Sequence, residues 1–550
     1  MLGFRIVAVL LVLELAAVAQ TYGNLTGVVT DSSGAVLSGA SITLSNLQLG
    51  STQEVRTNEA GLYRFSLIPP GRYKLTVNAS GFGTVTVNNL EVEVNASVRQ
   101  DVPLRVADVS QQVLVEAAAT SINQENAELG DVIETRKIVE LPLNGRNFLQ
   151  LGQLTTGTLP PSVQNNESTT QSFNGGRTNL TLSISGVREI SAAYLFDGIP
   201  SKHDYYGGVG SQPALDAISE FKIQRGYFSP QFGLGAIVNV VSRSGTNQFH
   251  GSLWEFVRNN VFDARNFFDA NRLPFRQNQY GAAAGLPVVR NKVFVFGDFE
   301  RLSARRGFQA QGVTASAAML SGDFSGLPTI YDPATLNPAT GQRQPFPGNR
   351  IPADRISRFA SDFSRYIPAA NTAGQVNLRG TTQLIQDDDK YDVRGDYVAS
   401  DKDRFFARLS VMNSALLRTA LTPLGGNSVP LRSRNAVASW TRVISPTLVN
   451  DLRVGLDRVF LFSNMPEEAA SQPNWPQAFG LRNLNEIAEC NGLPVVALAG
   501  YLSYGASGTC INTGNNNYHL IDNLSWVRGK HTVTAGFELI NVRFKETSSL

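Results

Sequence analysis

The side chains best suited to metal binding or nucleophilic chemistry in this 550-residue sequence are four histidines and two cysteines. The histidines are His203, His250, His519 and His531, and none belongs to an H-E-x-x-H or H-x-x-E arrangement, so a zinc-protease site has no support. The sequence also lacks a G-x-S-x-G nucleophile elbow and a G-x-x-x-x-G-K-S/T phosphate loop. We therefore expect no enzyme, with no catalytic residue, no cofactor and no metal site.

Cys490 and Cys510 are a candidate disulfide, because both lie in one expected long loop. An oxidising compartment would permit this bond, and closing such a loop contributes on the order of 3 kcal/mol by the chain-entropy estimate. Two unrelated free thiols are the alternative. The acidic run 387–389 could attract a cation, but a solvated loop or the start of a strand explains it better.

Composition excludes several classes of protein. Lys+Arg 47 against Asp+Glu 45 gives no electrostatic case for a nucleic-acid partner. Two cysteines exclude a disulfide-dense scaffold and a cysteine-based metal site. The 49 glycines favour turns and β-structure, and the length allows two to four domains.

Residues 1–19 have the pattern of a secretory signal peptide. Arg5 precedes an apolar stretch at 6–15, and Ala17-Val18-Ala19 is a small-x-small site that predicts cleavage between Ala19 and Gln20. A short membrane anchor is the alternative, but the apolar run is shorter than the roughly 20 residues that a spanning helix needs. The mature protein is then secreted, periplasmic, or held in an outer membrane by strands.

Residues 22–106 predict a small antiparallel β-sandwich, because short alternating strands are separated by turns at 32–34, 57–61 and 69–71. The order G-V-V-T-D followed by T-N-x-x-G-x-Y-x-F-x-x-I-P-P-G-x-Y-x-L-T-V resembles the carboxypeptidase regulatory-like (transthyretin-like) domain. That family consists of accessory modules, so no peptidase activity is implied. Carbohydrate binding is an alternative, but Tyr63, Phe65 and Tyr73 occupy alternating positions and are expected to be core.

Residues 107–130 are expected to be a polar linker with one β-prone island. The island consists of Val113, Leu114, Val115, Glu116 and Ala117. A strand with an unpaired edge can add to the sheet of a partner, which is how an energy-coupling protein could capture this segment. A plain tether that happens to contain Val and Leu is the alternative.

Residues 131–247 predict a compact αβ domain. A turn at 140–147 leads into a helix at 148–154, and a short helical signal (Leu215, Ile218, Phe221) precedes a β-prone run at 236–241. Inside a water-filled barrel the charges of this domain could face solvent or the polar inner face of the barrel. These charges are Asp197, Asp216, Glu220, Arg225 and Arg243. Ordinary surface charge on a free domain is the alternative.

Residues 248–550 show the alternation of a transmembrane β-barrel. Apolar and polar residues alternate over 391–397, 405–411, 451–457 and 532–539. Short turns at 400–402, 445–447 and 528–530 alternate with long loops at about 302–388, 414–432 and 461–517, as periplasmic turns and external loops do. We count about nine strands, whereas bacterial single-chain barrels have an even number. The sequence therefore predicts a partial barrel in an apparently truncated chain.

Several motifs in order carry a family resemblance. L-P-L-N-G-R-N-F (141–148), Y-L-F-D-G-I-P (194–200), D-A-I-S-E-F-K-I (216–223) and the run from G-A-I-V-N-V-V-S to G-S-L-W-E-F (235–256) resemble the plug domain and first barrel strand of TonB-dependent outer-membrane receptors. The similarity is greatest to the Oar-like branch, which carries a carboxypeptidase regulatory-like domain before the plug.

The resemblance implies a mostly β chain in the cell outer membrane, made of a signal peptide, a small transthyretin-like sandwich, an αβ plug and part of a barrel. It implies outer-membrane lipid around the barrel and TonB, the periplasmic energy-coupling protein, as a partner, with 113–117 as the candidate contact segment. The expected function is a plug-gated receptor or transporter of a small molecule, glycan or peptide. The alternative is a secreted or surface carbohydrate-binding, adhesin-like β-protein.

Overall fold

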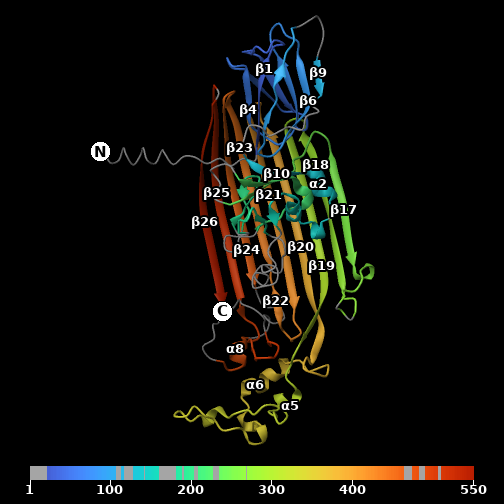
Figure 1. Ribbon diagram of the computed structural model, residues 1–550, viewed down its shortest axis with the longest axis vertical. Helices are drawn as coiled ribbons and strands as arrows, with labels where there is room; N and C mark the ends of the chain where they lie inside the picture. Colours follow the sequence, from blue (N-terminus) through green and yellow to red (C-terminus); the bar gives the residue numbers. More distant parts are fainter. Residues whose placement is uncertain are drawn as a thin grey trace, which may run out of the picture.

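The chain is mostly β, as the sequence predicts, and consists of an N-terminal sandwich, an inner αβ domain and a large outer sheet (Figure 1). No helix in the described part of the chain is long and apolar enough to cross a membrane. The predicted cleavage site at Ala19 and Gln20 lies outside the described residues. This computed structural model describes residues 22–106, 113–116, 128–141, 143–159, 181–188, 191–202, 209–226, 235–267, 269, 271–463, 474–481, 490–505, 510–529 and 531–549.

The N-terminal sandwich has two sheets, one in the order β4-β1-β7 with β8 beside β1, the other in the order β3-β2-β5-β6-β9. Its aromatic residues Tyr63, Phe65 and Tyr73 are all buried in the core between the sheets, as expected, rather than forming an exposed platform. The strands are β1 (Gly23–Thr30), β2 (Ser41–Asn46), β3 (Thr52–Arg56), β4 (Leu62–Ile68), β5 (Gly71–Asn78), β6 (Val85–Val92), β7 (Ser97–Arg99), β8 (Val102–Pro103) and β9 (Val113–Glu116).

The inner domain is a five-stranded sheet in the order β10-β15-β16-β13-β14, covered by short helical segments. Every residue of β16 is buried, as expected for a β-prone apolar run at the centre of a sheet. Its elements are β10 (Leu129–Glu134), α2 (Thr135–Glu140), η1 (Asn144–Arg146), η2 (Phe148–Leu154), β11 (Thr158–Leu159), β12 (Ser183–Ile184), β13 (Ala193–Phe196), β14 (Ile199–Pro200), η4 (Leu215–Ala217), β15 (Ile218–Gly226) and β16 (Ile237–Ser242).

Local predictions for the inner domain need three corrections. The helical spacing of Leu215, Ile218 and Phe221 produces only one 3₁₀ turn, because β15 pairs with β10 on one side and β16 on the other, and these ladders outweigh a short helical pattern. The spacing of Phe148, Leu151 and Leu154 predicts that they share one face of the helix at 148–154. This helix is present as 3₁₀, but Leu154 is 65% exposed whereas Phe148 and Leu151 are buried. The inner sheet already begins at Leu129, within the expected linker.

The outer sheet contains nine long antiparallel strands in sequence order and curves around the inner domain (Figure 1). Polar residues such as Asp392, Arg408 and Arg453 face the inner domain and are buried, whereas Val393, Leu409 and Val454 face outward and are about half-exposed, as a transmembrane barrel requires. The strands are β17 (His250–Asn259), β18 (Phe275–Val289), β19 (Val293–Gly312), β20 (Leu378–Val398), β21 (Asp403–Thr419), β23 (Leu431–Ser445), β24 (Leu448–Ser463), β25 (Cys510–Arg528) and β26 (His531–Ser549), with the short β22 (Gly426–Ser428) beside β21.

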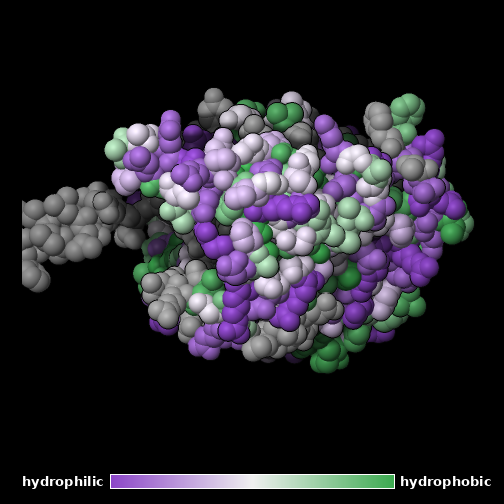
Figure 2. Space-filling model, turned by 90° about the horizontal axis from the view of Figure 1, so that it is seen from below, coloured by the Kyte–Doolittle hydropathy of each residue, from purple (hydrophilic) through white to green (hydrophobic). Residues whose placement is uncertain are grey.

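The two ends of the outer sheet differ. Short turns lie at the end that carries the sandwich, and the longer loops lie at the opposite end, which Figure 2 views face-on as a largely hydrophilic surface with hydrophobic side chains toward its margin. We call the outer sheet the wall. Small helical segments occur at its loop end and in its loops: η5 (Asn260–Phe262), α5 (Ala317–Leu320), η6 (Pro333–Thr335), η7 (Pro347–Asn349), η8 (Ala353–Arg355), α6 (Arg358–Phe363), η9 (Ser364–Tyr366) and α8 (Trp475–Ala478).

The loop predicted at 302–388 is too long, because β19 continues to Gly312 and β20 begins at Leu378. Polar residues are common in these extensions, and charges pair across the strands: Arg305 contacts Asp387 at 2.8 Å, and beside them Arg301 contacts Asp389 at 3.3 Å. The acidic run 387–389 is therefore part of a strand. A strand can continue with polar side chains, so the change in hydropathy marks the edge of the apolar band and not the end of the strand.

Candidate functional site

Asp197 and Gly198 form the two-residue turn between β13 and β14. Phe196 pairs with Ile199 across the turn, and both turn residues have positive φ, 49° and 84°, as the type I′ turn of a tight hairpin requires. A Cβ on Gly198 would lie 1.9 Å from Nη1 of Arg453 in β24. The tip of this inner-domain hairpin is therefore packed closely against the outer sheet.

The carboxylate of Asp197 is the centre of a buried polar network. Its Oδ1 accepts a hydrogen bond from the backbone N–H of Ser242 (2.9 Å), and its Oδ2 accepts from Oγ of Ser242 (2.7 Å) and from Nε of Arg408 (2.8 Å). Nη1 of Arg394 lies 3.6 Å from Oδ1. Burial alone would raise the pKa of Asp197, but the two guanidinium groups and the Ser242 donors outweigh it and hold the pKa below its usual value.

Arg408 joins this network to the backbone of the hairpin. It is fully buried in β21, donates from Nη2 to the carbonyl of Phe196 (2.9 Å), and lies 3.8 Å above the centre of the Phe196 ring. Nη2 also donates to the side chain of Asn435 in β23 (2.7 Å), which in turn donates to the carbonyl of Pro200 (3.0 Å). The wall thus contacts both strands of the hairpin.

A small apolar contact accompanies the polar one. Ile199 is fully buried and packs with Val437 and Ile521 of the wall. Gly455 in β24 leaves space for it, because a Cβ at position 455 would lie 2.4 Å from Cδ1 of Ile199. The position of the hairpin is therefore fixed by Ile199, which fills the space at Gly455, and by the charged network around Asp197.

A second ionic contact joins the inner domain to β19 and β20. Arg146 in η1 pairs with Asp216 in η4 and, through Nε, with Glu300 in β19 (3.0 Å). Lys390 in β20 lies 3.1 Å from the same glutamate, and the Arg146 guanidinium lies 5.1 Å from the centre of the Trp254 ring. Arg146 and Asp216 both belong to the inner-domain motifs singled out in the sequence.

The inner domain also contacts the sandwich. Oε1 of Glu220 in β15 accepts from the backbone N–H of Val94 (2.6 Å), and Nζ of Lys222 donates to the carbonyl of Asn95 (3.0 Å) and pairs with Glu128 (2.8 Å). The pKa of Glu220 is raised to about 8. Burial is the main cause and the repulsion from Glu93 adds to it, and together they outweigh the hydrogen bond from Val94 and the charge of Lys222.

The predicted coupling segment is the last strand of a sandwich sheet. Residues 113–116 form β9, which pairs in parallel with β6, Val85 with Val113 through Asn88 with Glu116. The sheet order ends at β9, so β9 has one paired edge within the described residues. Ala117 lies outside them.

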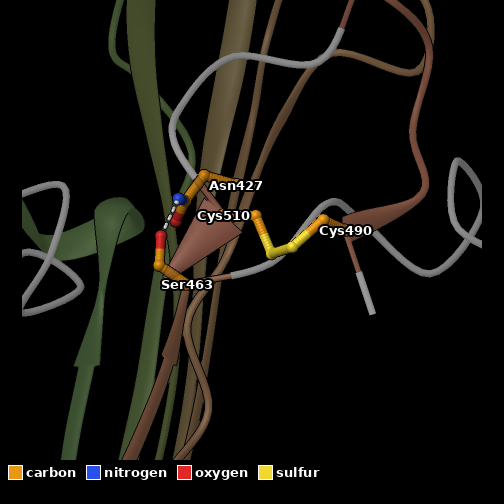
Figure 3. The surroundings of a disulfide bond; sticks show 4 residues. All are labelled: Asn427, Ser463, Cys490 and Cys510. Carbon is orange, nitrogen blue, oxygen red and sulfur yellow. Dashed lines mark hydrogen bonds between the residues drawn. A yellow bond between two sulfur atoms is a disulfide. The ribbon is translucent and has the colours of Figure 1, made fainter. Parts of the chain in front are cut away.

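Cys490 and Cys510 are joined by a disulfide at the loop end of the outer sheet, with a Cα–Cα distance of 5.4 Å (Figure 3). Cys510 is the first residue of β25, and nearby Nδ2 of Asn427 donates to Oγ of Ser463 (2.9 Å). The adjoining loops pack into a small apolar cluster that includes Phe363, Trp475 and Tyr504. The disulfide thus anchors one of the loops that share this apolar core.

The other charged residues and histidines considered in the sequence lie apart from the Asp197 network. Arg225 pairs with Asp131 (2.9 Å), and Nε of Arg243 donates to the carbonyl of Ile218 (3.1 Å). His519 lies beside Glu538 (3.4 Å) in the outer sheet, and His203 lies outside the described residues. Among the residues that the structure describes, no cluster of three or more His, Cys, Asp or Glu side chains could hold a metal ion.

Sequence reasoning identified Asp197 and Asp216 as inner-domain charges but did not identify their partners. Arg394, Arg408 and Arg453 come from three strands far along the chain, and nothing local connects them to Asp197. The one available signal was the alternation itself, because charged residues on the polar face of a barrel strand must point into the lumen.

Comparisons with known proteins agree with this architecture. A family model described as an outer membrane beta barrel domain matches residues 241–550, and a model of the carboxypeptidase regulatory-like domain matches residues 24–105. The TonB-dependent transporter Oar of Myxococcus xanthus is 23% identical over 271 residues, which cover 47% of this chain and 24% of that protein. The chain thus spans about a quarter of the length of this relative.

Solved structures to which the chain is similar include the outer membrane transporter YddB from Escherichia coli (12% identity, TM-score 0.47) and the siderophore receptor PirA from Acinetobacter baumannii (15% identity, TM-score 0.40). Each alignment covers 76% of this chain and 48% of the other. The sequence matches confirm the predicted resemblance to Oar-like TonB-dependent receptors and the outer-membrane location. Because the barrel model matches more than half of its residues, the chain belongs to the family of outer-membrane β-barrel proteins.

Proposed function

We propose that this chain acts as a plug-gated, TonB-dependent receptor or transporter whose ligand is captured by the loops at the far end of the barrel. The observation that carries the proposal is the contact of the Asp197 hairpin with Arg394, Arg408 and Arg453 of the wall. In this mechanism the inner domain is the plug, and energy supplied from the periplasm rearranges it. We assign no catalytic step to the chain.

The chemistry of the plug–wall contact suits a part that must move. An apolar contact loses its favourable burial when water enters, whereas carboxylates and guanidinium groups exchange protein partners for water. While the plug is seated, removing one partner of a buried ion pair is costly, so the pairs hold it in one position. Among the described residues, the apolar contact of the hairpin is the small one around Ile199, and a second apolar contact joins Ala214 and Ala217 to Phe296 of the outer sheet. We therefore assign the ionic network the role of a reversible lock.

The candidate TonB contact is 113–117, of which 113–116 form β9. An edge strand can accept a further strand from a partner sheet, and β10 of the plug follows shortly after it in the chain. β10 pairs along its length with β15, the strand that also holds the sandwich through Glu220 and Lys222. A pull on 113–117 would therefore reach the plug sheet through its outer strand, β10.

Fractionation tests the membrane part of the proposal. The chain should stay with outer membranes through high-salt and alkaline washing and should enter solution only with detergent, because its outward face carries apolar side chains. Recovery of folded chain in detergent-free buffer would contradict the receptor function and favour the secreted, glycan-binding alternative.

Site-specific photo-crosslinking tests the coupling segment without knowledge of the ligand. A photoreactive side chain in place of Val115 should form an adduct with TonB in energised cells, and dissipating the proton gradient should change its yield. The matched control replaces Ser32, in an exposed turn of the same sandwich. Equal adducts at both positions, or none at Val115, would sink the assignment of 113–117. Deleting 113–117 should likewise abolish energised uptake once a ligand is known, while leaving ligand binding intact.

A further inference from the structure

A pocket of about 350 Å³ lies on the outward face of the wall, on the opposite side of the strands from the plug. It is lined by Arg432, Arg434, Arg458, Phe460 and Phe462. On β23 and β24 the residues that alternate with these positions are buried against the interior: Ser433, Asn435, Val459 and Leu461. Because side chains alternate along a strand, the five pocket residues point away from the lumen.

The charges in this pocket are arranged unfavourably for an empty site. Arg434 and Arg458 are direct cross-strand partners, and like charges directly opposite each other destabilise a sheet. Within the described residues none of the three guanidinium groups forms an ion pair with a carboxylate. Arg434 donates instead to Met412 O (3.3 Å), Ser433 O (2.7 Å) and Asn413 Oδ1 (3.0 Å), and Arg458 lies 4.5 Å from the centre of the Phe460 ring.

The same outward face shows how the chain neutralises arginines elsewhere. On β19 and β20, Arg301 is directly opposite Asp389 and pairs with it at 3.3 Å, and Arg305 pairs with Asp387 at 2.8 Å. On β23 and β24 arginine faces arginine, and among the described residues no acidic side chain takes that position. A bound anion would neutralise Arg434 and Arg458 in the way that Asp389 and Asp387 neutralise Arg301 and Arg305.

The height of the pocket identifies where that anion comes from. Trp440, an outward aromatic residue near the short turns, pairs with Leu452, and Phe462 lies ten positions further along β24, which is roughly 33 Å along the strand, or about 25 Å along the barrel axis for a typical tilt. The apolar band of an outer-membrane barrel is about 25 Å tall. The pocket therefore occupies the outer part of the apolar band and reaches its external border, next to the lipid headgroups.

Aromatic residues mark the same two borders. Near the short turns, Tyr397, Phe405 and Trp440 stack in a row on the outward face, with the Phe405 and Trp440 rings 6.0 Å apart. In the pocket, Phe460 and Phe462 stack at 6.2 Å. Leu452, Val454 and Leu456 lie between the two levels on β24. Two aromatic rows with an apolar stretch between them match the girdles of a membrane barrel.

We propose that this pocket binds the phosphorylated headgroup of a lipid in the external leaflet. The phosphate would lie between Arg434 and Arg458, where guanidinium groups make charge-assisted and bidentate bonds to phosphate oxygens. Phe460 and Phe462 would contact the apolar part of the same lipid. A free phosphate ion would match the arginines but not the two rings, so the site fits a lipid.

Thermal unfolding and lipid analysis of the full chain in detergent micelles test this proposal. The probes are diphosphorylated lipid A, the same lipid without phosphates, and inorganic phosphate. We expect diphosphorylated lipid A to raise the unfolding temperature of the wild type, and the other two to leave it nearly unchanged. We also expect the chain purified from outer membranes to retain phosphorylated lipid.

The double variant R434Q/R458Q should retain at least roughly fivefold less phosphorylated lipid and lose the temperature rise. Without lipid it should unfold no earlier than the wild type, because the change removes a repulsive pair; the single variant R458Q gives a second, milder test. The matched control is R301Q, which removes an outward arginine that already has a partner and should keep both responses. Equal lipid retention by R434Q/R458Q and the wild type would overturn the proposal, as would an equal response to inorganic phosphate.

Discussion

Against the outer sheet, the inner domain, which we propose is the plug, places a carboxylate among arginines. Against the sandwich, it places a carboxylate near other carboxylates. Asp197 accepts from Ser242 and Arg408 and lies near Arg394. Glu220 accepts from the Val94 N–H, and Glu93 and Glu91 act on it through space. The first contact holds the pKa of its acid below the usual value, and the second raises it to about 8.

The two contacts therefore respond differently to pH. A lowered pKa contributes stability that is present above the unfolded value near 3.8 and is lost only as pH falls through the lower folded value. A raised pKa contributes stability that is complete below about 4.5 and is lost as pH rises toward about 8. Near neutral pH the wall contact is constant, whereas the sandwich contact weakens as pH increases. The plug therefore has one contact whose strength does not change near neutral pH, with the wall, and one adjustable contact whose strength depends on pH, with the sandwich.

The largest expected effect is that of D197N, which removes the charge that three wall arginines surround. Unpairing a buried ion pair costs about 3–5 kcal/mol, so backbone amides of β13 and β16 should exchange hydrogen roughly a hundredfold faster or more. Hydrogen exchange followed by mass spectrometry measures this change. Exchange in the sandwich core should not change.

The control for D197N is D131N, the same chemical change at the plug residue that pairs with Arg225. Asp131 is 41% exposed, and exposed pairs contribute about 0–1 kcal/mol. If D131N and D197N increased plug exchange equally, the wall network would have no special role in holding the plug.

How far the sequence predicted this arrangement depends on the range of the interactions. The Asp-Gly dipeptide at 197–198 predicts a tight turn, and alternation over 391–397 and 451–457 predicts that Arg394 and Arg453 share one face with other polar residues. Both are local patterns of period two. The meeting of Asp197 with Arg408 depends on the register of strands more than two hundred residues later, which no local pattern contains.

The wrong predictions have the same origin. Ile218 and Phe221 have helical spacing, but they form a strand because β10 and β16 supply hydrogen-bonding partners on both sides. The polar residues of the β19 and β20 extensions predict a loop, yet these residues are in strands, where Arg305 and Asp387 form an ion pair across the two strands. In each case a tertiary partner decides the local structure.

An intermediate effect is expected for G198A, which tests whether the hairpin tip is tightly fitted. Its φ of 84° is unfavourable for alanine by about 1–2 kcal/mol, and the new Cβ would collide with the buried Arg453 guanidinium. The control is G186A in the same domain, where φ is 75° but nothing lies within 4 Å of the new Cβ. Plug amide exchange should increase more in G198A than in G186A; equal increases would mean that backbone strain alone matters.

The smallest expected effect is a pH dependence, and it separates the two contacts most directly. In the wild type, the protection of the Val94 amide, corrected for intrinsic exchange, should fall between pH 5 and 8.5, because opening the contact returns Glu220 to its usual pKa and releases its proton. The total change is on the order of 2 kcal/mol, since Glu220 is partly exposed. E220Q keeps an acceptor for Val94 but cannot titrate, so its Val94 protection should stay level across this range. D197N should loosen the plug and still show the wild-type pH dependence at Val94. A level profile in the wild type, or an unchanged slope in E220Q, would contradict the assignment of the adjustable contact to Glu220.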